Sequence, residues 1–193
     1  MRLDKNTAAI DTDFISHIIE SKVGIDVVID KLKIIFSELK LAVIIHPLVY
    51  KHELMHNNPS IKRLFDDKII LQVEFEDIFN GDEDKKLYYI YLLEELYHHM
   101  HGELYPFKDN DAFVKWKKGQ SLGEIHSLSM CLVSGCGYFL SDDKGSKTLA
   151  IYINTLTGNR IIVYSREELV YKHLDEGTTS IKRNIRTSLT HEK

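Results

Sequence analysis

One stretch in the second half of the chain, residues 122–147, restricts the fold most strongly, because it combines a helix, a buried strand and an acidic loop. Its first part carries apolar residues at helical spacing, namely Leu122, Ile125, Leu128, Leu132 and Val133. Gly135 can end this helix, and Tyr138-Phe139-Leu140 then forms a short apolar strand of the kind that parallel sheets bury on both faces. Asp142 and Asp143 follow at once. The stretch therefore predicts an α/β fold with carboxylates at the end of a parallel strand.

The remaining segments extend this pattern. Residues 7–10 and 42–45 are two further short apolar strands, and helical spacing of apolar residues follows each of them. A long Tyr-rich helix is predicted from about residue 82 to 102. Residues 151–153 and 161–164 flank Thr157-Gly158-Asn159, which is typical of a β-hairpin turn. We therefore expect a three-layer α/β domain over residues 1–154, with a central parallel sheet flanked by helices and a helical insertion at about 56–120. A hairpin and helix over residues 155–193 would form a C-terminal extension.

Composition restricts the class of protein. With 193 residues, 44% of them hydrophobic, the chain is long enough for one domain with a sizeable core. Its net charge of −4 argues against non-specific binding of long duplexes and leaves room for a local basic patch. Two cysteines do not make a disulfide framework and suit a reducing compartment. Since no apolar run approaches the ~20 residues that cross a bilayer, we expect a cytoplasmic protein without a membrane partner.

Acidic residues recur near the predicted strand ends. Asp11 ends the first strand, Glu53 lies on the helix after the second, and Glu124 lies in the first turn of the helix before the third. Because parallel strands end at one edge of a sheet, these residues should surround one pocket with Asp142 and Asp143. Such carboxylates repel one another unless a hard cation lies among them, and Mg²⁺ or Mn²⁺ suits these ligands. A solvated helix start and an Asp-Asp turn would produce the same pattern.

Three segments resemble the motifs of PIN domains. The hexapeptide Ile10-Asp11-Thr12-Asp13-Phe14-Ile15 resembles the opening strand and acidic motif of that family. The segment from Leu122-Gly123-Glu124 to Leu128 resembles its acidic helix start, and residues 139–145 (FLSDDKG) resemble its late strand and acidic loop. The resemblance covers residues 7–149. The sequence between the second strand and the third acid is longer than in the compact members of the family.

The resemblance implies a metal-dependent endoribonuclease that hydrolyses phosphodiester bonds. The implied catalytic residues are Asp11, Glu53, Glu124 and Asp143. The implied ligands of Mg²⁺ or Mn²⁺ are Asp11, Glu124, Asp142 and Asp143, and the implied supporting residues are Thr12, Asp13 and Ser141. Because many PIN proteins are the toxins of toxin–antitoxin pairs, the implied partners are an RNA substrate, an antitoxin protein and a second copy of the chain.

Basic residues must offset an acidic pocket if RNA is to approach it. Lys144 and Lys147 lie beside the acidic loop. Lys115 and Trp116 pair a positive charge with an aromatic ring that can stack on a base. We therefore predict that these four residues bind the substrate. A solvated basic loop with one anchoring tryptophan is the alternative interpretation of residues 115–118.

A second motif indicates a different function. Residues 52–56, HELMH, fit the H-E-x-x-H pattern, in which two histidines on a helix bind Zn²⁺ and Glu53 would be the general base of a metalloprotease. That function needs a third ligand, and no downstream residue stands at a recognisable spacing. With 10 histidines in the chain, a chance match is an alternative. A PIN-like interaction module without catalysis is a third hypothesis, which the retained carboxylates disfavour because unpaired buried charges cost stability.

Overall fold

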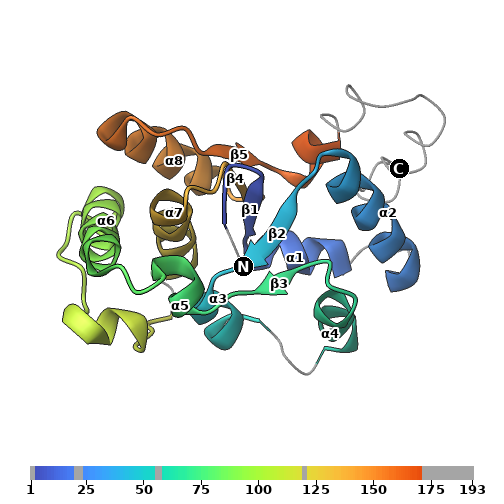
Figure 1. The fold of residues 1–193 in the computed structure, drawn as a ribbon, viewed down its shortest axis with the longest axis horizontal. Helices are drawn as coiled ribbons and strands as arrows, with labels where there is room; N and C mark the ends of the chain where they lie inside the picture. Colours follow the sequence, from blue (N-terminus) through green and yellow to red (C-terminus); the bar gives the residue numbers. More distant parts are fainter. Residues whose placement is uncertain (1–2, 20–23, 55–57, 119–120, 171–193) are drawn as a thin grey trace.

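A five-stranded parallel sheet forms the centre of the computed structural model (Figure 1). The structure describes residues 3–19, 24–54, 58–118 and 121–170. The strands are β1 (Thr7–Ile10), β2 (Ala42–Ile45), β3 (Leu71–Gln72), β4 (Tyr138–Leu140) and β5 (Ile162–Tyr164). Their order is β3-β2-β1-β4-β5, and each neighbouring pair is parallel. This confirms the predicted α/β fold with a central parallel sheet.

Helices cover both faces of the sheet, which makes three layers (Figure 1). One face packs against α1 (Thr12–Ile19), α2 (Ile25–Glu38) and α4 (Pro59–Asp66). The other packs against α5 (Phe75–Phe79), α6 (Glu83–His101), α7 (Leu122–Ser134) and α8 (Lys144–Thr157). Two further short helices are α3 (Pro47–His52) and the 3₁₀ helix η1 (Asp109–Phe113), and residues 166–170 are also helical.

The strand side chains alternate between two hydrophobic cores. Ala9 and Phe139 belong to the core under α7, whereas Ile10 and Leu140 belong to the core under α1. Successive side chains of a strand point to opposite faces, so a strand covered on both faces must be apolar throughout. This explains why the strand segments are continuous apolar runs.

The C-terminal hairpin prediction is wrong. Residues 151–153 lie inside α8, which ends at Gly158 in the left-handed conformation with φ 71°. β5 pairs with β4 in parallel, with Tyr138 opposite Ile162. A glycine of this conformation ends helices as readily as it turns hairpins, which explains the error. The part of the predicted extension after residue 170 lies outside the described residues.

The region between β2 and α7 contributes to the sheet as well as to the helical layers. α6 agrees with the predicted helix at residues 82–102 and packs on α7. Between α4 and α5, Leu71–Gln72 pairs with β2 as the edge strand β3. A purely helical insertion is therefore too narrow a description of residues 56–120.

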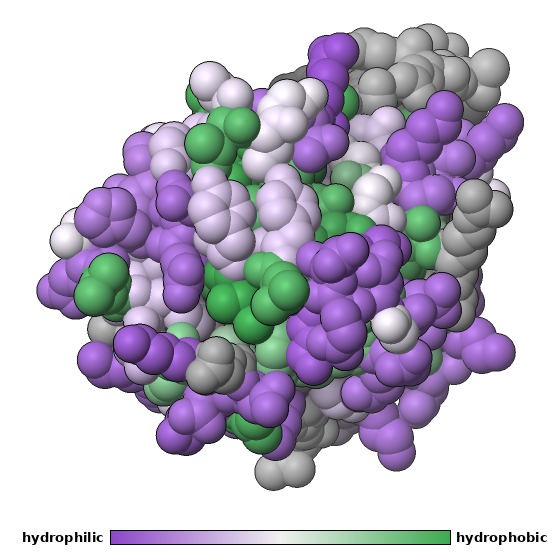
Figure 2. All heavy atoms as spheres, turned by 60° about the vertical axis from the view of Figure 1, so that its left-hand side comes forward, coloured by the Kyte–Doolittle hydropathy of each residue, from purple (hydrophilic) through white to green (hydrophobic). Residues whose placement is uncertain are grey.

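The outer surface of α6 and α8 carries exposed apolar and aromatic side chains. Figure 2 shows pale and green side chains gathered on the face that contains α6. The exposed residues of these two helices include Leu87, Tyr88, Tyr91, Ile151 and Leu156. Among the helices in the described segments, none has both the length and the apolar composition needed to cross a bilayer.

Candidate active site

The candidate site lies where the sheet changes its winding direction. β2 and β4 flank β1 on opposite sides, and the loops after β1 and β4 meet at the carboxyl edge between them. Open α/β sheets bind ligands at this kind of switch point. The backbone N–H of Asp11 donates to the carbonyl of Leu140 at 2.9 Å, and the hydroxyl of Ser141 donates to Asp11 Oδ2 at 3.1 Å. These two bonds join the loops at the crevice.

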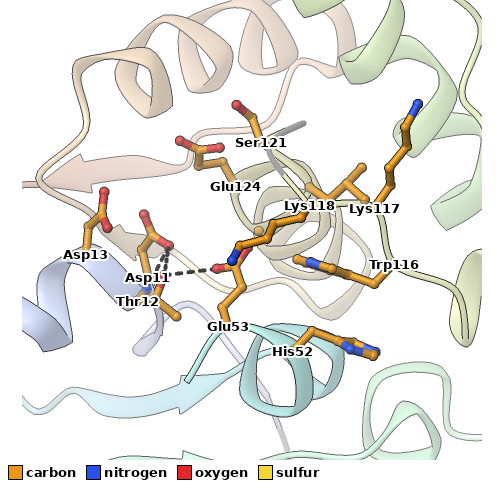
Figure 3. Close-up of a pocket in the computed structure, with 12 residues that line it drawn as sticks. Asp11, Thr12, Asp13, His52, Glu53, Trp116, Lys117, Lys118, Ser121 and Glu124 are labelled. Carbon is orange, nitrogen blue, oxygen red and sulfur yellow. Dashed lines mark hydrogen bonds between the residues drawn. The ribbon is translucent and has the colours of Figure 1, made fainter. Parts of the chain in front are cut away.

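A cavity of about 460 Å³ opens at this edge (Figure 3). Four of its lining residues are acidic and come from three parts of the fold. Asp11 and Asp13 lie at the end of β1 and the start of α1, Glu53 directly follows α3, and Glu124 lies in the first turn of α7. The other lining residues are Thr12, His52, Trp116, Lys117, Lys118, Ser121, Leu122 and Gly123.

Hydroxyl and backbone groups orient the carboxylates. The backbone N–H of Thr12 donates to Asp11 Oδ1 at 2.7 Å, while Ser141 holds the other oxygen. The hydroxyl of Thr12 donates to Glu53 Oε2 at 2.9 Å, and this bond is drawn in Figure 3. Thr12 thereby joins the end of β1 to the end of α3.

Asp143 joins the cluster through Glu124. Its Oδ1 accepts a hydrogen bond from the backbone N–H of Gly145 at 2.7 Å, which caps α8. Its own backbone N–H donates to the hydroxyl of Ser141 at 3.1 Å. Burial raises the pKa of Glu124, and the neighbouring Asp143 carboxylate adds to this effect. The structure thus brings together Asp11, Glu53, Glu124 and Asp143.

Burial raises the pKa of three of these carboxyls: Asp11 to about 6, Glu53 to about 7 and Glu124 to about 8. Neighbouring negative charges add to the effect of burial. Asp13 acts on Asp11, whereas the charge of Asp11 acts on both Glu53 and Glu124. Crowded buried carboxylates are stabilised either by taking up protons or by a nearby cation.

The donors suit a hard divalent cation. Asp11, Glu53 and Glu124 direct carboxylate oxygens to one cavity, and Mg²⁺ or Mn²⁺ prefers such ligands. Within the described segments, no three His, Cys, Asp or Glu side chains already stand in the arrangement of a metal site. The fit rests on the donor chemistry and on the burial of like charges.

Six predicted site residues are not part of the cavity lining. Ser141 and Asp143 lie next to residues that line it, whereas the other four lie away from the cavity. The carboxylate of Asp142 accepts from Arg166 Nε at 2.5 Å and contacts His17 Nδ1 at 2.9 Å. Burial would raise the pKa of Asp142, but hydrogen bonds and the charge of Arg166 hold it below its ordinary value. Lys147 pairs with Glu168 at 2.5 Å, Lys115 pairs with Asp111 at 2.7 Å, and Lys144 begins α8 outside the cavity lining.

Other residues enter the site that the sequence did not single out as site residues. Lys117 and Lys118 line the cavity in place of Lys115, and Gly123 lies against the carboxylate of Glu53. A Cβ at residue 123 would lie 2.8 Å from Glu53 Oε2. The acid that approaches Gly123 is Glu53, which is 70 residues earlier in the sequence, so the local sequence carried no signal for this contact.

The structure places the H-E-x-x-H motif at the end of a helix. α3 ends at His52, and Glu53 is the residue that follows the helix. The metalloprotease motif needs both histidines on one helical face. His56 lies outside the described residues, and Glu53 is engaged by Thr12.

Comparisons with known proteins identify no relative. The chain matches no protein-family model, no curated protein and no solved structure.

A buried chain of hydrogen bonds lies behind the cavity and joins α3, α6 and α7. His46 Nδ1 accepts from the backbone N–H of Leu48 at 3.2 Å, and burial keeps the pKa of His46 well below its usual value. The proton of this neutral ring is therefore on Nε2, which donates to the hydroxyl of Tyr89 at 2.8 Å. Tyr89 then donates to His126 Nδ1 at 2.7 Å, and His126 Nε2 donates to the hydroxyl of Tyr105 at 3.0 Å.

Tyr89→Phe tests whether this chain stabilises the domain. The change removes one oxygen and leaves a buried donor on His46 and a buried acceptor on His126 without partners. Such groups cost about 1–3 kcal/mol each, so we expect the melting temperature to fall by roughly 4–24 °C. Thermal unfolding followed by circular dichroism measures this. Tyr97 is a buried tyrosine on the same helix that takes no part in this series of hydrogen bonds, so Tyr97→Phe is the matched control. Equal losses in the two variants would contradict the interpretation.

Gly123→Ala tests the close approach of Glu53. The new methyl group would displace the Glu53 carboxylate, while alanine favours the helix by a few tenths to about 1 kcal/mol. We expect the melting temperature to be unchanged or higher and the metal-dependent cleavage that the resemblance to PIN domains implies to fall by about 10- to 100-fold, because small misplacements of reacting groups are costly. Gly24→Ala, where a Cβ meets open space, is the control for a harmless methyl group.

Proposed function

We propose that the chain is a metal-dependent nuclease of the PIN type that hydrolyses phosphodiester bonds in RNA. One observation carries the proposal, the convergence of Asp11, Glu53, Glu124 and Asp143 at the switch point of a parallel sheet. Burying like charges next to one another costs stability when nothing compensates them. A bound divalent cation would supply that compensation, which is why the arrangement supports a metal site.

Asp11 and Glu124 would hold the metal ion, because their carboxyls lie deepest, 5% and 8% exposed. Ser141 and Thr12 orient Asp11 through the contacts at its two oxygens. A bound divalent cation lowers the pKa of a water molecule and neutralises charge at the phosphodiester. Asp143 would complete the donor set from the start of α8.

Glu53 is the residue best placed to accept a proton from the attacking water. Thr12 engages its Oε2, and both carboxylate oxygens lie beside Gly123 in the lining of the cavity. Its pKa of about 7, raised by burial and by the charges of Asp11 and Asp13, lies near neutral pH, which favours proton transfer there. The resemblance to PIN domains implies products with a 5′-phosphate and a 3′-hydroxyl.

Cleavage of end-labelled single-stranded RNA in Mg²⁺, Mn²⁺, Zn²⁺ or EDTA tests the proposal. We expect cleavage in Mg²⁺ or Mn²⁺ and a loss of about 100- to 1,000-fold in Asp11→Asn, the range for removing one group that stabilises transition-state charge. Asp84→Asn, an exposed residue of α6, is the matched control. Cleavage that survives Asp11→Asn would contradict the proposal. Loss in His56→Ala together with a requirement for Zn²⁺ would favour the metalloprotease motif.

The toxin role, the antitoxin and the homodimer remain predictions from the family resemblance. The exposed apolar residues of α6 and α8 form the surface on which we would expect either protein partner to bind, because contiguous exposed apolar side chains mark interaction sites (Figure 2). Size-exclusion chromatography with light scattering tests the homodimer directly.

A further inference from the structure

The cavity has a second wall of different chemistry. Opposite the carboxylates lie His52 and the segment Trp116–Lys118 (Figure 3). This wall offers two aromatic rings and two ammonium groups, whereas the first wall offers oxygen ligands. A single cavity of about 460 Å³ thus combines a site for a cation with a site for an aromatic and anionic ligand.

The two rings of this wall are stacked. The centroids of His52 and Trp116 are 5.4 Å apart, with 12° between the ring planes. Trp116 also stacks on His126, at 5.7 Å and 26°, and His126 is fully buried. The half-buried indole packs against both hydrophobic cores, so its position is determined by the fold. His52 is exposed, lines the cavity and stacks on this rigid support.

The ammonium groups of Lys117 and Lys118 are available to a ligand. Lys115 and Lys147 are held by acidic partners, but neither Lys117 nor Lys118 forms an ion pair with another described residue. Both are exposed, and in Figure 3 Lys118 extends toward the carboxylates whereas Lys117 points away from them. Lys118 can therefore bind a phosphate group beside the acidic wall, and Lys117 can bind one farther from the carboxylates.

We propose that His52 and Trp116 form a base-stacking subsite that, with Lys117 and Lys118, holds an unpaired nucleotide next to the carboxylates. A base in a duplex is covered on both faces by its neighbours, so only an unpaired base can offer its face to the imidazole of His52. The phosphates of the same nucleotide would lie on the two lysines. This inference rests on the proposed function in one respect, that the adjoining phosphodiester lies at the carboxylates.

Trp116 makes the subsite directly observable, because it is the only tryptophan of the chain. The experiment titrates the protein with a short adenylate oligonucleotide while recording tryptophan fluorescence, with Ca²⁺ in place of Mg²⁺ and the oligonucleotide checked afterwards for integrity. A strand of the same length without bases and a duplex of the same length are the comparison ligands. We expect quenching by the adenylate strand and much weaker quenching by the other two.

Variants separate the base from the phosphates. His52→Ala should weaken binding of the adenylate strand by about 5- to 100-fold, the effect of losing one stacked base, and leave binding of the abasic strand unchanged. His98→Ala, an exposed histidine of α6, is its control. The double variant Lys117→Gln, Lys118→Gln should weaken both ligands and reduce the dependence of affinity on salt, whereas exposed Lys62→Gln should do neither.

Two outcomes would overturn the inference: equal quenching by the adenylate and abasic strands, or an equal loss of both ligands in His52→Ala. The readout is independent of catalysis. If the base-dependent quenching is present and no metal supports cleavage, the subsite stands and the proposed hydrolysis fails. If cleavage occurs without any base-dependent quenching, the hydrolysis stands and the subsite fails.

Discussion

Replacing Glu124 with glutamine is expected to abolish cleavage and at the same time to stabilise the metal-free protein. Burial, the charge of Asp11 and the contact with Asp143 raise the pKa of Glu124 to about 8. Ionising this group in the folded state costs free energy that the unfolded chain does not incur. Glutamine keeps the shape without the charge, and its amide can donate to Asp143. We expect a gain of about 1–2 kcal/mol, or roughly 2–8 °C, near pH 8 and a 100- to 1,000-fold loss of activity.

The pH dependence of this gain identifies its cause. In the folded state the pKa of Glu124 lies above its ordinary value of 4.5. The carboxyl therefore costs no stability below about pH 4.5, where it is protonated in both states, and the cost grows as the pH rises through about 8. The difference in melting temperature between variant and wild type, measured in EDTA, should therefore be near zero at about pH 4.5 and increase toward alkaline pH. Exposed Glu94→Gln on α6 should show no such difference. A gain that is constant with pH would contradict this explanation.

The central sheet could be predicted from short-range signals. Residues 8–10 and 43–45 are apolar because both of their faces are buried, and this pattern is visible in the sequence alone. The hairpin could not be excluded in the same way. Ile151-Tyr152-Ile153 favours a strand by composition, yet Leu149, Ala150 and Ile153 are the residues that α8 buries in the core. Tertiary packing, which the local sequence does not contain, decided between the two.

A site residue could be predicted when it directly follows a strand or lies at the start of a helix. Asp11 and Glu124 stand at such positions, and both line the cavity. As metal ligands, Asp142 and Asp143 could not be distinguished, because they are neighbours in one acidic loop. Arg166 decides between them by binding Asp142 from 24 residues away in the sequence. Contacts of this length leave no local signal.

The same limit applies to the basic residues and to the buried histidines. Lys115 and Lys117 are two residues apart in the sequence. Only the structure shows that Lys115 pairs with Asp111 and that Lys117 lines the cavity. His46 and His126 are 80 residues apart and are joined through one tyrosine hydroxyl. The sequence shows which residues are charged or aromatic, but the direction in which their side chains point depends on the packing of distant helices.

Raising the pH is expected to destabilise the metal-free protein, and a divalent cation is expected to restore its stability. Asp11, Glu53 and Glu124 have pKa values of about 6, 7 and 8, above their ordinary values. The folded state therefore binds more protons than the unfolded chain, and stability is lost as the pH rises from about 4.5 to 8. Asp142 acts in the opposite direction, because its lowered pKa makes its contribution disappear only as the pH falls below about 4. We expect the highest melting temperature in EDTA near pH 5.

Mn²⁺ should reverse this loss, since a bound cation replaces the protons that the carboxylates otherwise retain. At a concentration about 100 times its dissociation constant it would add about 2.7 kcal/mol, or roughly 5–10 °C, and the effect should be larger at about pH 8 than at pH 5. Asp11→Asn should remove the response, and exposed Asp84→Asn should keep it. An equal response in Asp11→Asn would place the ion elsewhere. Because this measurement needs no RNA, it tests the carboxylate cluster as a metal site independently of the substrate.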